Sequence, residues 1–281
     1  MDFRTLVDIP APGFSIAPCE PLLFVGSCFA DNIGQRFKEE GFPVVINPFG
    51  TMYNPASVLH SVEKMCNEEL EMRNDGAGLS SFKTVFLTLG TNHVYRLKET
   101  GEIVDNCQKR PAALFQEEEL SVDQCADYLR QSITLLRQVN PGIRIVLTVS
   151  PIRYRKYGYH GSQLSKATLL LAVNTVISGF AADDVAYFPA YEIVNDELRD
   201  YRFYASDMLH PSDQTVEYIW ERLVDTYFSP EAKAFLKEWE PLKHALAHKP
   251  FNPNSEEYQT FMDKTLLKVE EIRKKYTTFA L

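Results

Sequence analysis

Cysteine is scarce in this chain of 281 residues, which holds five of them at positions 19, 28, 66, 107 and 125. The number is odd and the spacing is wide. No two of them have the close spacing of a zinc site, and nothing suggests a disulfide framework. We therefore expect free thiols, as in a protein of a reducing compartment.

Long apolar runs are also missing. The longest, around Leu169–Val173, is far shorter than the roughly 20 residues that a membrane-spanning helix needs. The first residues, Met1–Thr5, lack the basic and apolar segments of a secretion signal. These two absences predict a cytoplasmic protein with no membrane partner.

Positive charge is in deficit, with 29 basic against 38 acidic residues and a net charge of −9. This balance argues against a general phosphate-binding surface for DNA or RNA. Glycine-rich phosphate-binding motifs are absent. His244 and His248 have the spacing of metal ligands on a helix, but no third ligand is evident. We expect no metal and no organic cofactor.

What the sequence does contain is a regular alternation of short apolar runs and helical patterns. A β-strand is expected at each of 22–25, 44–46, 84–89, 143–149 and 185–188, with helices between them. This order predicts an α/β fold with a five-stranded parallel sheet and helices on both faces. In such folds, ligands bind beyond the carboxyl ends of the strands.

The rest of the chain is expected to surround this sheet. A loop is predicted over 67–80, a hairpin over 94–107 and a basic, tyrosine-rich loop over 153–161. A helix should follow at 164–180. Residues 1–228 would form the main domain, and two amphipathic helices in 229–281 would pack on it as an extension.

A candidate nucleophile follows the first strand. The strand stops at Gly26, and a helix is expected from Asp31, so Ser27 and Cys28 lie in the turn between them. A helix N-terminus offers backbone N–H groups to a developing negative charge. The alternative is a tight turn whose cysteine only packs against its neighbours.

Partners for a nucleophile occur later in the chain. The spacing of Asp207 and His210 puts a carboxylate and an imidazole on one side of a single turn, as an orienting acid and a base. Gly50 and Asn92 could supply oxyanion donors, from the backbone and the side chain respectively. Alternatively, Asp207 caps a helix, His210 is an exposed turn residue, and the other two are ordinary turn residues.

The stretch Gly26-Ser27-Cys28-Phe29-Ala30 resembles the signature of the GSCFA family, which is related to the SGNH (GDSL-type) hydrolases. The order of the four motifs described above also resembles that of the SGNH hydrolases. The resemblance implies a flavodoxin-like three-layer αβα sandwich. In the ungapped register the nucleophile is Cys28, whereas a shift of one residue would make it Ser27.

Four further residues are candidates for substrate binding: Asn47, His93, Arg153 and His160. The alternative is a solvated loop around Arg153 and a histidine at 93 that only fills space. The resemblance implies an acyl hydrolase that acts on an acylated carbohydrate or small metabolite. An acyltransferase with the same residues, or a catalytically silent binding protein, stays open as an alternative.

Overall fold

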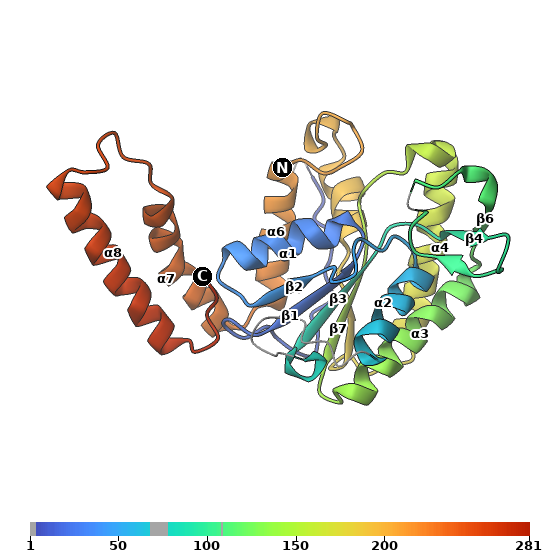
Figure 1. Ribbon diagram of the computed structural model, residues 1–281, viewed down its shortest axis with the longest axis horizontal. Helices are drawn as coiled ribbons and strands as arrows, with labels where there is room; N and C mark the ends of the chain where they lie inside the picture. Colours follow the sequence, from blue (N-terminus) through green and yellow to red (C-terminus); the bar gives the residue numbers. More distant parts are fainter. Residues whose placement is uncertain (1–3, 68–77, 108) are drawn as a thin grey trace.

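The computed structural model describes residues 4–67, 78–107 and 109–281, whose larger sheet has five parallel strands (Figure 1). The strand order is β2-β1-β3-β7-β8, which confirms the predicted α/β class and parallel sheet. The strands are β1 (Leu22–Gly26), β2 (Val44–Ile46), β3 (Thr84–Leu89), β7 (Arg144–Val149) and β8 (Val185–Tyr187).

Alternating side chains divide the core into two apolar layers, because successive residues of a strand point to opposite faces. In β1, Leu22 and Phe24 join one layer, and Leu23 and Val25 join the other. Two helices cover the first face, α1 (Cys28–Glu39) and α6 (Asp213–Tyr227). Three cover the second, α2 (Pro55–Asn67), α3 (Val122–Val139) and α4 (Gly158–Ile177).

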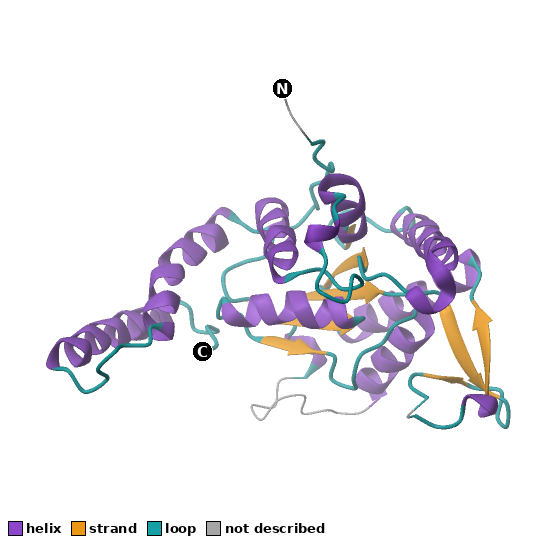
Figure 2. Ribbon diagram, turned by 90° about the horizontal axis from the view of Figure 1, so that it is seen from above, coloured by secondary structure: helices purple, strands orange, loops and turns teal. Residues whose placement is uncertain are grey.

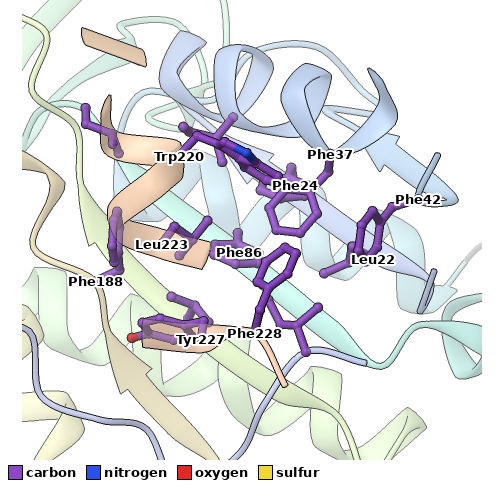
Figure 3. Close-up of a cluster of buried hydrophobic side chains, with 14 of the residues drawn as sticks. Leu22, Phe24, Phe37, Phe42, Phe86, Phe188, Trp220, Leu223, Tyr227 and Phe228 are labelled. Atoms are coloured by element: carbon purple, nitrogen blue, oxygen red, sulfur yellow. The ribbon is translucent and has the colours of Figure 1, made fainter. Parts of the chain in front are cut away.

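Aromatic side chains dominate the layer beneath α1 and α6 (Figure 3). The rings of Phe24 and Phe86 stack with centroids 4.6 Å apart, which joins β1 to β3. Phe37 of α1 meets Trp220 of α6 edge to face at 4.8 Å. Such pairs stabilise beyond the area that they bury, and here they fix the two helices on the sheet.

A smaller antiparallel sheet lies at one end of the molecule, opposite the C-terminal helices (Figure 2). Its strands are β4 (His93–Leu97), β5 (Ile103–Val104) and β6 (Phe115–Glu119). β4 and β5 form the predicted hairpin, with Gly101 at φ +74° in the turn. β6 was not expected, because its glutamate-rich sequence lacks an apolar alternation.

Several element boundaries differ from the predictions. Helix α1 begins at Cys28 rather than Asp31, since Ser27 caps it. The predicted loop over 153–161 contains a 3-10 turn and the start of α4. Gly158, the first residue of α4, has φ +68°. Most of the predicted loop over 67–80 lies outside the described residues. Short turns complete the fold: η1 (Leu79–Ser81), η2 (Ala112–Leu114), η3 (Arg155–Tyr157), α5 (Ala190–Glu192), η4 (Ile193–Leu198) and η5 (Tyr201–Phe203).

The C-terminal segment consists of the two expected helices, α7 (Pro230–Ala247) and α8 (Glu256–Lys275). Trp239 is buried, and its Nε1 donates to the carbonyl of Glu39 at 3.3 Å, at the end of α1. The N–H of Ala280 donates to the carbonyl of Gly41 at 2.9 Å. Residues 229–281 therefore pack on the carboxyl end of α1, while a domain boundary at 228 stays a prediction.

None of the helices in the described residues combines the length and the apolar character that crossing a membrane requires.

Candidate active site

The turn after β1 is shaped by a glycine that no other residue could replace without strain. Gly26 has φ +140°, and a Cβ atom there would lie 2.0 Å from the carbonyl oxygen of Thr88. The close approach lets the N–H of Ser27 donate to that oxygen at 3.0 Å. The chain can therefore leave the sheet at Ser27 and begin α1 at Cys28.

Ser27 and Cys28 have different surroundings. Ser27 is fully buried; its Oγ accepts the N–H of Phe29 at 3.3 Å and lies 3.0 Å from Oγ1 of Thr88. Cys28 is half-buried, and its Sγ lies 3.7 Å from Nε2 of His210. Of the two candidate nucleophiles, the cysteine is the one in contact with the imidazole.

Asp207 and His210 are joined within one turn, as their spacing predicts. Nδ1 of the imidazole lies 2.5 Å from Oδ2 of the carboxylate. The other oxygen, Oδ1, accepts the N–H groups of His210 and Leu209 at 3.0 and 2.9 Å. Hydrogen bonds from the His210 backbone, its imidazole and the Leu209 backbone lower the pKa of Asp207 to about 2, so the carboxylate is ionised at neutral pH.

Arg153 supports this turn from the loop after β7. Its N–H donates to the carbonyl of Leu209 at 3.1 Å, and its Nη1 donates to the carbonyl of Met208 at 3.0 Å. The guanidinium also lies over the rings of Tyr159 and Tyr204, at 4.3 and 5.3 Å from their centroids. Arg153 thus holds the segment that carries the carboxylate and the imidazole.

The loop after β2 braces the nucleophile turn. Asn47, at φ +42°, accepts the N–H of Gly26 on its Oδ1 and donates Nδ2 to Asp31, both at 2.8 Å. The N–H of Gly50 donates to the carbonyl of Asn47 at 2.8 Å. This N–H is used in a hydrogen bond within the loop, whereas the sequence analysis expected it to donate to the oxyanion.

Asn92 and its neighbour are also engaged internally. The buried Asn92 donates Nδ2 to the carbonyl of Leu120 at 2.8 Å, which uses one of its two amide N–H groups. Its oxyanion role stays a prediction. The ring of His93 stacks on Tyr157 with centroids 3.6 Å apart, and burial lowers the pKa of His93. His160 is exposed on the first turn of α4.

Two further residues lie in this region: Lys166, which the sequence analysis did not single out, and Tyr154 of the predicted tyrosine-rich loop. Lys166 of α4 is buried, and its Nζ donates to the carbonyls of Gly90 and Ser150 at 2.7 and 2.6 Å. The hydroxyl of Tyr154 is buried and has no hydrogen-bond partner among the described residues. Lys166 could have been noticed as a lone charge in line with Leu169 on the apolar face of its helix.

The electrostatics of Cys28 combine opposing effects. Burial is the main cause that raises the pKa of its thiol, and the charges of Asp31 and Asp207 raise it further. Its own backbone N–H and the charge of Lys166 lower it. The resting thiol therefore keeps its proton at neutral pH and needs a base to become a nucleophile.

A groove of about 1400 Å³ runs between α1, α6 and α7, and His210 is one of the residues that line it. Its lining mixes polar residues such as Asp31 and Gln35 with apolar ones such as Trp220 and Leu236. Among the described residues, no group of three or more His, Cys, Asp or Glu side chains is placed to hold a metal ion.

Comparisons with solved structures find proteins of similar architecture at low identity. One is a GDSL-like lipase from Bacteroides thetaiotaomicron (14% identity, TM-score 0.44, 78% of this chain and 88% of that chain). Another is a lipolytic protein of the G-D-S-L family from Veillonella parvula (10%, 0.46, 74% and 97%). A third is a mutant of an acetyl-xylooligosaccharide esterase from Geobacillus Stearmophilus (12%, 0.45, 76% and 96%). At these scores and identities, the similarity says nothing about the reaction.

A search of curated proteins finds no match. The GSCFA family matches residues 21–77 and 71–223, and the C-terminal domain of GSCFA domain proteins matches residues 239–281. Together these matches span most of the chain and both parts of the fold described above. The chain therefore belongs to the GSCFA family.

Proposed function

We propose that the protein is a thiol-dependent acyl hydrolase in which Cys28, His210 and Asp207 form the catalytic triad. The observation that supports this proposal is one continuous row of contacts. Sγ of Cys28 lies 3.7 Å from Nε2 of His210, and Nδ1 of His210 lies 2.5 Å from the Asp207 carboxylate. An ionised carboxylate keeps the proton on Nδ1, so Nε2 is free to accept the thiol proton.

The proposed reaction has two halves. In the first, the Cys28 proton passes to Nε2 of His210, and Sγ attacks the carbonyl carbon of an acyl ester. The C–O bond then breaks, the alcohol takes the proton from His210, and a thioester remains on Cys28. In the second, His210 takes a proton from water as the water oxygen attacks the thioester carbon. The C–S bond then breaks, the proton on His210 returns to the Cys28 sulfur, and the free acid leaves.

We propose that the oxyanion is held by groups other than those predicted from sequence. The backbone N–H of Cys28 lies at the start of α1 and interacts with its own sulfur, where it lowers the pKa of the thiol. The buried hydroxyl of Tyr154 lacks a partner among the described residues, and burial, with a further contribution from the charge of Cys28, raises its pKa. Both groups are donors near the attacking atom, whereas Gly50 and Asn92 donate elsewhere.

We propose an acylated carbohydrate or small polar metabolite as the substrate. The groove that reaches His210 suits a sugar-like leaving group, since its carboxylates and amides can accept and donate hydrogen bonds and its apolar residues can pack against the ring.

The test is ester hydrolysis by the purified protein, first with p-nitrophenyl acetate and then with acetylated sugars. Cys28→Ala and His210→Ala should each lower kcat/KM by about 10³-fold or more. Cys107→Ala removes another half-buried thiol and should leave the rate unchanged. Turnover by the Cys28→Ala variant at the wild-type rate would refute the proposal. Product that forms only with an added alcohol acceptor would indicate acyl transfer instead.

A further inference from the structure

A buried lysine lies at the carboxyl edge of the sheet that also carries the proposed nucleophile. Lys166 is on the inner face of α4 and is only 2% exposed, in line with the apolar residues Leu169 and Val173. Its Nζ reaches the carboxyl edge of the sheet, where it donates to the carbonyls of Gly90 and Ser150. These residues directly follow β3 and β7.

Among the described residues, the charge on Lys166 has no counterion. No ion pair of the described residues includes it, and its neighbours are carbonyls and the rings of Tyr154 and Tyr191 at 5.2 and 5.8 Å. An unpaired buried ammonium group is costly, and burial lowers the pKa of Lys166 to about 7. An apolar side chain would fill the same space with a smaller desolvation penalty, so packing alone does not explain a lysine at this position.

The sheet edge that holds Lys166 also holds the nucleophile turn. Thr88, two residues before Gly90, accepts the N–H of Ser27 at 3.0 Å. The nucleophile turn and Lys166 are thus both tied to the end of β3, through Thr88 and Gly90. Their charges act on each other: the ammonium lowers the pKa of the thiol, and negative charge on the sulfur raises the pKa of the lysine.

The other titratable groups that face Cys28 come from four different segments. They are Asp31 of α1, Asp207 and His210 of the loop before α6, Tyr53 of the loop before α2 and Tyr154 of the loop after β7. Both carboxylates oppose negative charge on the sulfur. The ammonium group of Lys166 acts in the opposite direction and favours negative charge on the sulfur.

We propose that Lys166 is a positioning residue of the site, whose buried ammonium group stabilises the negative charge that forms on Cys28 when its proton passes to His210. Lys166 keeps its three protons during this step, so only the Sγ–H bond breaks and only the Nε2–H bond forms. The inference rests on the proposed role of Cys28 and does not depend on which ester is cleaved. The alternative is a structural role, in which Lys166 only joins the ends of β3 and β7 through its hydrogen bonds to Gly90 and Ser150.

The test follows the alkylation of Cys28 by iodoacetamide against pH, by mass spectrometry of the peptide that contains it. Lys166→Gln keeps a hydrogen-bond donor but removes the charge. It should raise the apparent pKa of the Cys28 thiol and slow alkylation at pH 7 by about tenfold, which corresponds to one pKa unit. Lys98→Gln is the matched control, since Lys98 also donates to a backbone carbonyl but lies exposed on the smaller sheet.

A second measurement needs no change at Lys166 and covers the case in which Lys166→Gln does not fold. Titration of the Lys166 Nζ by nitrogen NMR should give a higher pKa in Cys28→Asp than in wild type, because this variant carries a negative charge at the position of the sulfur at pH 7, where the resting thiol is protonated. Cys107→Asp should leave the lysine titration unchanged.

Two unchanged results would overturn the inference: the same thiol pKa in folded Lys166→Gln, or the same lysine pKa in Cys28→Asp. Both readouts are independent of ester turnover. A protein that shows this coupling but cleaves no ester would refute the proposed function alone. An active esterase without the coupling would refute the role of Lys166 alone.

Discussion

Two adjacent residues share the turn after β1 and have different tasks. Ser27 is enclosed, and its hydroxyl is engaged by Phe29 and Thr88, so it serves as the N-cap of α1. Cys28 is the first residue of the helix and points its sulfur at His210. A hydroxyl that is fully used in structural hydrogen bonds is a poor candidate for attack on a substrate.

Ser27→Ala should therefore affect stability more than catalysis. Loss of the cap and of the bond to Thr88 should lower the free energy of unfolding by about 1–2 kcal/mol, measured by denaturant titration. Its kcat should stay within about threefold of wild type, in contrast to Cys28→Ala. A loss of turnover by Ser27→Ala as large as that expected of Cys28→Ala, in protein that is still folded, would identify the serine as the nucleophile.

At the scale of elements, the base and its orienting acid depend on a neighbouring loop. The turn that carries Asp207 and His210 has Met208 at φ +60°, and Arg153 donates to the carbonyls of Met208 and Leu209. A turn with one residue in the left-handed region is costly, so contacts from outside must hold it in place.

Arg153→Ala should loosen this turn without removing a reacting group. We expect kcat to fall by about tenfold with a smaller change in KM, because the imidazole spends less time in line with Cys28. Hydrogen exchange of the segment 205–212 should become faster. Arg130→Ala, which removes an exposed arginine of α3, should change neither quantity. Unchanged exchange in Arg153→Ala would show that the arginine does not hold the turn.

Elements with a strong apolar pattern could be predicted from sequence, and others could not. β1, β3 and β7 are buried on both faces, so their unbroken apolar runs gave the sheet. β6 could not be predicted, because its run of glutamates shows no alternation of apolar and polar residues. It is a strand because it pairs with β4. The start of α1 was placed three residues late, since a cysteine at the first position is not a usual helix signal.

At the scale of the whole molecule, the C-terminal helices are joined to the core through α1. Trp239 is enclosed between Phe279 and the end of α1, and its indole N–H is satisfied by Glu39. The same helix α1 begins at Cys28, so packing at its far end helps to fix the nucleophile's helix.

Trp239→Ala should destabilise the entire protein rather than residues 229–281 alone. Loss of a large buried side chain should lower the free energy of unfolding by about 3–5 kcal/mol, in one cooperative transition followed by circular dichroism. Phe251→Ala is the control, because that ring is fully exposed and should contribute nothing measurable. Two separate transitions in the variant would show that the extension unfolds independently.

The meeting of the triad is also a property of the whole molecule. Cys28 and His210 are 182 positions apart, and the parallel sheet brings them to one edge. The sequence motifs at strand ends identified both residues as candidates, and the spacing of Asp207 and His210 predicted that these two side chains would meet. The hydrogen bonds that engage Gly50 and Asn92, and the buried charge of Lys166, depend on tertiary packing that no local pattern records.

If the sulfur of Cys28 takes the acyl group, that group can be trapped on it. The protein is mixed with p-nitrophenyl acetate, quenched in acid within the first turnover and digested for mass spectrometry. We expect one acetyl group on the Cys28 peptide as a thioester that hydroxylamine removes, and none in His210→Ala on the same timescale. An acetyl group on Ser27 instead, or turnover with no acetylated Cys28, would contradict this role of Cys28.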